Sequence, residues 1–149
     1  MRIRLALAAA VLGVTLGGAA LACSKPKDAA AIEASLADWI NGERAKKGLP
    51  RLSVNADLGA AAAKHACKMA ADAKLSHAGF PSRLRGAGFG SGVENVARST
   101  ESSASAPVRI WKGSSKHWEN ILNSGARSMG LGTATAGGRT YYVFMAGSR

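Results

Sequence analysis

The chain has 149 residues and carries 20 lysines and arginines against 9 aspartates and glutamates, a formal net charge of +11. This length favours a single domain with one core. The cationic residues are scattered along the sequence and do not form blocks. We therefore expect them to lie on the solvated surface, and we do not expect nucleic acid as a partner.

The N-terminus has the pattern of a targeting segment. Arg2 and Arg4 precede an apolar run over residues 5–16, and residues 20–22 (Ala-Leu-Ala) fit the small-x-small pattern of a cleavage site. The run is short for a transmembrane span, and no second one follows. We therefore predict a signal peptide over residues 1–22, and a secreted or periplasmic chain with no transmembrane segment after its removal.

Two cysteines, Cys23 and Cys67, remain after that cleavage. An even number of cysteines in an oxidising compartment favours a disulfide. In the chain-entropy model such a bond would stabilise by roughly 3–4 kcal/mol. The alternative is a lipid anchor at Cys23, because residues 21–23 also resemble the end of a lipoprotein signal, and Cys67 would then lack a partner. The disulfide is the preferred interpretation, and both remain open.

A first helix is predicted after a lead-in over residues 23–29. Apolar residues recur at helical spacing at Ile32, Leu36, Trp39 and Ile40. The helix is expected to continue through the charged residues 43–47. Gly48 is placed to cap its C-terminus.

A second, alanine-rich helix is predicted over residues 56–74, with Asn55 as its N-cap. One face carries Leu58, Ala62, His65, Met69 and Ala73. His65 is expected to be a hydrogen-bonded packing residue on that face. Cys67 points away from it, toward a segment crossing the other side of the helix. The alanines at 60–63 would let a neighbouring element approach closely.

Residues 76–100 are expected to be irregular. Six helix and strand breakers fall in this span: Gly79, Pro81, Gly86, Gly88, Gly90 and Gly92. They argue against a long helix or a long regular strand. Loops of this kind on a rigid scaffold often carry function.

The last third of the chain predicts a short helix and then a hairpin. The helix opens at Ala106-Pro107, with Val108, Ile110 and Trp111 as its apolar side, and further helical turns follow over residues 116–123. Alternating residues at 129–133, a turn at 136–139 and a β-run at 140–145 predict the hairpin. Helices first and strands last indicate an α+β domain or an αβα sandwich.

The order of several sequence fragments resembles a known family. The fragments are residues 41–52 (NGERAKKGLPRL), 63–70 (AKHACKMA), 75–77 (LSH), 93–97 (VENVA), 111–122 (WKGSSKHWENIL) and 129–132 (MGLG). In this order they resemble the CAP superfamily, the SCP/PR-1-like domain, in its short bacterial secreted form. The resemblance implies a three-layer αβα sandwich over residues 30–149, with a central cleft.

The same resemblance assigns residues to that cleft. In the family it holds a histidine from a Ser-His fragment, a glutamate from a Gly-Glu-Asn fragment and a second histidine, which correspond to His77, Glu94 and His117. Val93 stands where the family has glycine before the glutamate. The second cleft glutamate of animal and plant members corresponds to Ser114, so that carboxylate is absent.

Two imidazoles and a carboxylate are a known combination of zinc ligands, which leaves the fourth coordination position for water. The resemblance therefore implies that His77, His117 and Glu94 could hold zinc or another divalent cation. The alternative is structural, with Glu94 accepting a hydrogen bond from one histidine and holding loops over the core. Asn95 is expected to fix its loop through side-chain to backbone bonds. Together with Ser114, these residues form the candidate ligand-binding site: His77, Glu94, Asn95, Ser114 and His117.

These residues favour binding over catalysis. Ser114 and Ser115 have His117 at helical distance, but neither an oriented base nor an oxyanion hole can be identified. We expect a monomeric, non-enzymatic binding or interaction module that takes a divalent metal and a lipid or anionic envelope component. The alternatives are a metal-dependent hydrolase of peptide, nucleic acid or cell wall, with Glu94 handling protons, and a basic adhesin for anionic surfaces.

Overall fold

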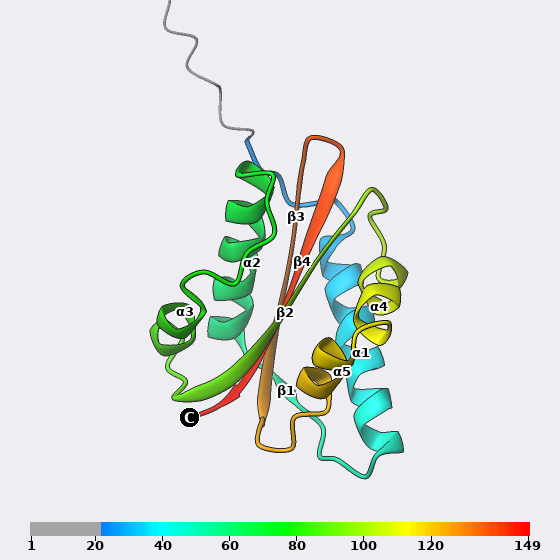
Figure 1. The fold of residues 1–149 in the computed structure, drawn as a ribbon, viewed down its shortest axis with the longest axis vertical. Coiled ribbons are helices and arrows are strands. Elements are labelled where there is room, and N and C mark those ends of the chain that lie inside the picture. The colour runs from blue at the N-terminus through cyan, green and yellow to red at the C-terminus, as the bar shows by residue number, and fades with distance from the viewer. Residues whose placement is uncertain (1–21) are drawn as a thin grey trace, which may run out of the picture.

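The computed structural model describes residues 22–149, so the predicted signal peptide lies outside the described residues except for Ala22. The described part is α+β, as predicted, and Figure 1 shows its arrangement. Its elements are α1 (Ala29–Lys46), β1 (Ser53–Val54), α2 (Ala56–Ala71), α3 (Phe80–Gly86), β2 (Ser91–Ser99), α4 (Ser105–Lys112), α5 (Ser115–Ile121), β3 (Ser128–Ala136) and β4 (Arg139–Ser148).

The four strands form one sheet in the order β1-β3-β4-β2. β1 pairs with β3 in parallel, while β4 pairs with both β3 and β2 in antiparallel fashion. α1, α4 and α5 cover one face of the sheet, and α2 and α3 cover the other (Figure 1). The predicted αβα sandwich is therefore confirmed, and β2 and the β1/β3 pair are its two edges.

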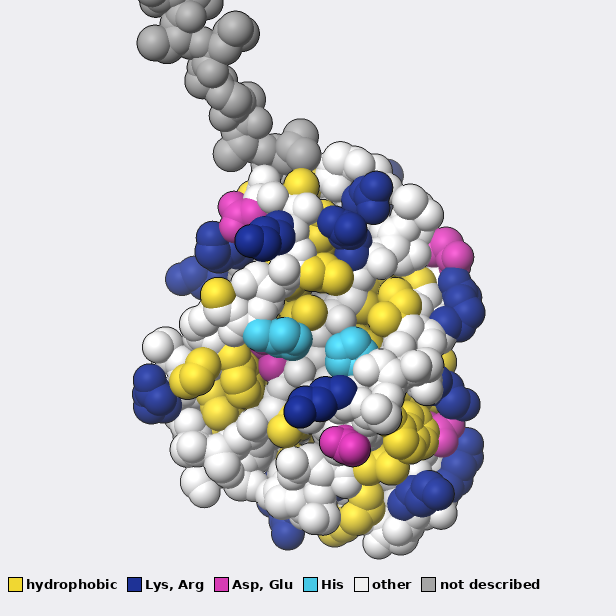
Figure 2. Space-filling model, viewed as in Figure 1, with side chains coloured by type: hydrophobic (Ala, Val, Ile, Leu, Met, Phe, Trp, Pro, Cys, Tyr) yellow, Lys and Arg dark blue, Asp and Glu magenta, His cyan; other side chains and the backbone are white. Residues whose placement is uncertain are grey.

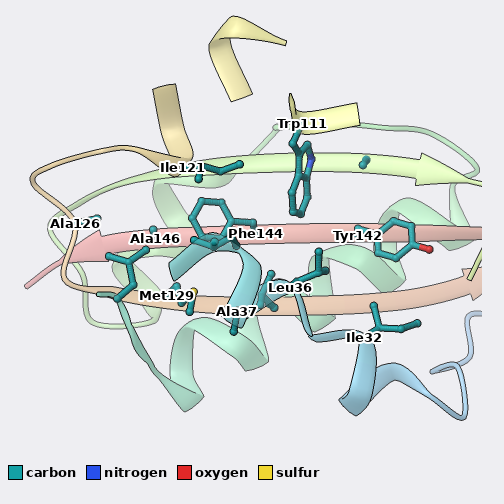
Figure 3. Close-up of a cluster of buried hydrophobic side chains, with 14 of the residues drawn as sticks. Ile32, Leu36, Ala37, Trp111, Ile121, Ala126, Met129, Tyr142, Phe144 and Ala146 are labelled. Carbon is teal, nitrogen blue, oxygen red and sulfur yellow. The ribbon is translucent and has the colours of Figure 1, made fainter. Parts of the chain in front are cut away.

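Apolar side chains alternate between the two faces of β4 and build two cores. On the α1 face, Leu36, Trp111 and Phe144 pack together, with the ring centroids of Trp111 and Phe144 6.2 Å apart (Figure 3). On the α2 face, Leu58 and Met69 pack against Val143 and other β4 residues. The alternation follows from the two-residue period of a strand.

α2 lies directly on β3 because two strand positions have no side chain. A Cβ atom on Gly130 would lie 2.2 Å from the backbone nitrogen of Gly59, and one on Gly132 would lie 2.2 Å from that of Ala63. The close approach predicted for the alanines at 60–63 is confirmed, and it is the strand glycines that permit it.

α2 begins as predicted and ends earlier. The Asn55 side chain caps it by accepting a hydrogen bond from the Leu58 amide at 3.0 Å. The helix ends at Ala71, and Ala73, predicted to lie on its buried face, is exposed with φ of 51°. That left-handed residue turns the chain toward His77. The disulfide joins Cys67 to Cys23, with 5.3 Å between their Cα atoms, so this prediction is confirmed.

The prediction that residues 76–100 contain no long regular strand is wrong. β2 is nine residues long and pairs with β4 along its full length, from Ser91 opposite Ser148 to Ser99 opposite Thr140. Gly92, read as a breaker, is needed by the packing: a Cβ there would lie 2.4 Å from the Ala146 carbonyl oxygen and 2.9 Å from Leu84. A glycine that is required for close approach looks the same in sequence as one that ends a strand.

The hairpin and the short helices follow the predictions with one exception. Gly137 and Gly138 both have positive φ, 56° and 69°, which a two-residue hairpin turn requires. α4 begins one residue before Ala106-Pro107. Ile110 is 38% exposed, so its assignment to the buried side is wrong, because this short helix buries the stripe that contains Trp111 instead. None of the helices within residues 22–149 is long and apolar enough to span a membrane.

Candidate functional site

Three elements bring the predicted residues to the outer edge of the sheet. His77 follows α2, Glu94 lies on the edge strand β2, and His117 lies in α5. Figure 2 shows two histidine side chains near the middle of the face in view. The third histidine of the chain, His65, is only 3% exposed. The strand alternates its side chains, so Glu94 faces the α2 and α3 layer while Asn95 faces α5.

Glu94 is the centre of the contacts on the first of these sides. Its side chain is 1% exposed, and one carboxylate oxygen accepts a hydrogen bond from His77 Nδ1 at 2.8 Å. Arg83 Nη2 lies 2.9 Å and 2.7 Å from the two carboxylate oxygens. A buried carboxylate needs such a cationic partner to remain charged. Arg83, in α3, was not predicted from the sequence, since nothing in its spacing links it to Glu94.

The contact with Glu94 defines the state of the His77 ring. A carboxylate paired with arginine accepts hydrogen bonds and does not donate them, so Nδ1 of His77 carries the proton. In the neutral ring the lone pair is then on Nε2. The His77 side chain is 54% exposed, which leaves the ring open to solvent.

His117 is held from its backbone. Ser114 caps α5 by accepting a bond from the His117 amide at 3.4 Å, and Asn95 Nδ2 donates to the His117 carbonyl at 2.9 Å. Asn120 donates to Asn95 Oδ1 at 2.8 Å and so fixes that amide. Asn95 therefore makes a side-chain to backbone bond, although it lies on a strand and not in a loop. Asn120 lies in the 111–122 fragment of the family resemblance, but no role was predicted for it.

The surroundings of the His117 ring favour its neutral form. Burial is the main cause that lowers the pKa of His117, and the nearby charge of His77 lowers it further. Its Nδ1 atom is buried and has no hydrogen-bond partner among the described residues. A neutral imidazole with a free ring nitrogen is the form that binds metal ions.

His65 supports the site from behind. It is buried, and its Nε2 donates to the carbonyl of Ser76, the residue before His77, at 2.6 Å. Burial is again the main cause that lowers the pKa of His65. The predicted hydrogen-bonded packing role is confirmed, and it positions the turn that carries His77.

The donor set fits a metal ion only in part. His77 Nε2 and the His117 ring offer two imidazole nitrogens, whereas both oxygens of Glu94 are engaged by Arg83. Within residues 22–149 no group of three or more histidine, cysteine, aspartate or glutamate side chains is arranged to hold a metal. The arrangement can therefore supply two ligands, with the carboxylate orienting one of them.

An αβα sandwich with a histidine–glutamate pair and a second histidine at its sheet edge defines a CAP-type domain. The family model of the cysteine-rich secretory protein family, CAP, matches residues 37–146. The chain belongs to this family. No curated protein sequence matches the chain.

Solved structures agree on the fold. An extracellular protein with an SCP domain from Bacillus anthracis is 22% identical with a TM-score of 0.72, and the match covers 80% of this chain and 41% of that one. An outer surface protein of Borrelia burgdorferi is 22% identical with a TM-score of 0.71, covering 78% and 91%. A cysteine-rich secretory protein of Staphylococcus aureus is 22% identical with a TM-score of 0.64, covering 80% and 39%. The chain thus spans less than half of the first and third of these proteins.

Proposed function

We propose that the chain is an exported, non-enzymatic CAP-domain binding module that takes a divalent transition-metal ion at the β2 edge of its sheet through His77 and His117. The contact of Glu94 with His77 Nδ1 carries the proposal. Histidines that bind metals commonly donate their other ring N–H to a carboxylate, which fixes the tautomer and the ring orientation. Arg83 keeps Glu94 in place for that role.

The proposal gives Glu94 a positioning role in place of the direct ligand role that the family resemblance implies. Both its oxygens are already bonded, and releasing one would cost one of the two contacts that Arg83 makes with the buried carboxylate. Two imidazoles suit zinc, copper or nickel. Water, or a group from a bound envelope component, would complete the coordination, so the proposed affinity is weaker than that of a four-ligand structural site.

The surroundings of Ser114 support binding over catalysis. Its hydroxyl accepts a hydrogen bond from the His117 backbone amide as a helix cap, and no hydrogen bond joins it to the His117 ring among the described residues. Export is supported by the disulfide and by the extracellular or surface proteins that share the fold. A basic surface suits an anionic envelope component as the macromolecular partner.

The test is calorimetric titration of the mature chain, residues 23–149 with the disulfide intact, with ZnCl₂. We expect one ion per chain, at least tenfold weaker binding in His77→Ala and His117→Ala, and a 10- to 100-fold loss in Glu94→Gln. Glu101→Gln is the matched control for Glu94→Gln, because the Glu101 side chain is 54% exposed and its ion pair is with Arg109. No binding at millimolar zinc, or equal binding by wild type and His77→Ala, would reject the proposal.

A further inference from the structure

The two histidines of the site are held in different ways. The His77 ring is fixed directly, because its Nδ1 donates to the buried carboxylate of Glu94 at 2.8 Å. The His117 ring has no such contact at Nδ1, which is buried without a hydrogen-bond partner within residues 22–149. The position of the His117 ring therefore depends on how α5 lies against the sheet.

α5 cannot set that position by itself. It has seven residues, fewer than the roughly 12–15 below which an isolated helix is marginal in water. Its placement must come from contacts with the rest of the domain, and it lies against β2 (Figure 1). Ile121 packs its side chain into the core on that side. Apolar burial is non-directional, so directional bonds are needed to fix the rotation of the helix that aims His117.

Asn120 supplies such bonds. It lies three residues after His117, so both side chains leave the helix on the same side. Its Nδ2 donates to the Glu94 carbonyl at 3.2 Å and to Asn95 Oδ1 at 2.8 Å. Asn95 is fully buried, and its own Nδ2 donates to the His117 carbonyl at 2.9 Å. α5 is thus joined to β2 at two consecutive strand residues.

The orientation of both amides follows from these partners. A backbone carbonyl accepts hydrogen bonds and cannot donate, so the group of Asn120 that faces the Glu94 carbonyl is its NH₂. That NH₂ requires an oxygen from Asn95, which leaves the Asn95 NH₂ for the His117 carbonyl. Without Asn120, the buried Asn95 oxygen would lose its donor, and nothing would orient the Asn95 amide toward His117.

We propose that Asn120 is the positioning residue of the His117 ligand, because it fixes α5 on the strand that also holds His77. The inference rests on the proposed metal-binding function of the two histidines. His77 is held through the side chain of Glu94, and His117 is held through Asn95 and the Glu94 carbonyl. One strand is then the frame for both imidazoles, and a metal site requires such a rigid frame to keep its ligands in place.

The test is calorimetric titration of the mature chain with ZnCl₂ in Asn120→Ala. We expect zinc binding about tenfold weaker than in wild type, at the lower end of the range for residues that orient a metal ligand. Asn123→Ala is the matched control. The Asn123 side chain accepts from the amides of Gly125 and Ala126 at 2.9 and 3.0 Å, so this variant also loses two hydrogen bonds, in the turn before β3. It should bind zinc as wild type does, because lost stability alone leaves the affinity of the folded chain unchanged.

A second measurement needs no variant, and it decides the matter if Asn120→Ala does not fold. If the bonds of Asn120 strengthen zinc binding about tenfold, zinc must favour those bonds by the same factor. Hydrogen exchange of the Asn95 and Asn120 side-chain amides in the wild-type mature chain, measured by NMR, should therefore slow about tenfold at saturating zinc. Exchange of the Asn123 side-chain amide should stay the same.

The outcomes for Asn120 and for the metal site are distinguishable. Absence of zinc binding by wild type at millimolar zinc, or equal binding by His77→Ala, would reject the metal site and with it the role of Asn120. Zinc binding that His77→Ala loses and Asn120→Ala keeps would overturn the role of Asn120 alone. So would side-chain amide exchange that zinc leaves unchanged, or an equal loss of affinity in Asn120→Ala and Asn123→Ala.

Discussion

Gly132 in β3 is a position where a single added methyl group should be costly, because every close contact would be with the backbone of α2. A Cβ atom there would lie 2.2 Å from Ala63 N, 2.3 Å from Ala62 C and 2.5 Å from Ala63 Cα. Ordinary contacts of this kind begin at 3.4 Å. In Gly132→Ala, α2 must therefore move away from the sheet by more than 1 Å, since no flexible side chain is available to yield.

The expected cost follows from that displacement. Overpacking a core by one methyl group costs typically 1–3 kcal/mol, and we expect about 3 kcal/mol here because all three contacts are backbone atoms. An unfolding entropy of about 2.1 cal/mol/K per residue gives about 0.27 kcal/mol/K for the mature chain. The loss then corresponds to a fall in Tm of about 11 °C.

The fall in Tm is measured by thermal unfolding of the mature chain with the disulfide intact, monitored by circular dichroism. Gly42→Ala is the control, because a Cβ there has nothing within 4 Å and alanine in a helix interior is about 0.5–1 kcal/mol more stable than glycine. A Tm of Gly132→Ala within about 2 °C of wild type would refute the reasoning, and so would an equal loss in Gly42→Ala.

Three further outcomes are expected. The intact mass of the exported protein should show two hydrogens fewer than the reduced chain, and Cys67→Ser should lose about 2–5 kcal/mol of stability. Burial lowers the pKa of His65 in the folded chain, so the unfolded chain takes up a proton on His65 at a higher pH than the folded chain does. The free energy of unfolding, measured with urea, should therefore fall as the pH drops below about 6.5. It should fall less in His65→Gln, which cannot take up this proton. Arg44→Lys should lose about 3 kcal/mol in the same assay, because the fully buried Arg44 donates to the carbonyls of Pro50, Ile121 and Asn123 at 2.8–3.0 Å and lysine cannot reach all three.

Each of these has a result that contradicts it. A diacylglycerol mass increment on the exported chain would replace the disulfide with the lipid anchor at Cys23. An unchanged pH slope in His65→Gln would mean that other groups account for the acid sensitivity. Full stability of Arg44→Lys would mean that the carbonyls at the end of α5 find other donors.

The parts of the fold that could be predicted are those with a local physical signal. Helical spacing of Leu36 and Ile40 predicts α1, and the Asn55 cap predicts the start of α2. The glycine pair at the hairpin turn predicts the β3–β4 connection. β2 could not be predicted, because it is stabilised by its pairing with β4, and the reason for Gly92 is a carbonyl oxygen more than 50 residues away in sequence.

The candidate site also contains residues that could be predicted and residues that could not. His77, Glu94 and His117 came from the family resemblance, since their spacing alone does not bring them together. Arg83 shares a short helix with Arg85, and only the fold shows that Arg83, and not Arg85, reaches Glu94. The role of Glu94 depends on that contact, so the difference between a metal ligand and a positioning residue could not be seen in the sequence.

The sheet edge that carries the histidine site is protected against pairing with another strand. On β2, the outward carbonyls of Glu94 and Val96 accept bonds from Asn120 Nδ2 at 3.2 Å and Trp111 Nε1 at 3.4 Å. These side chains block strand addition at the histidine edge, which is one way that proteins protect an edge strand.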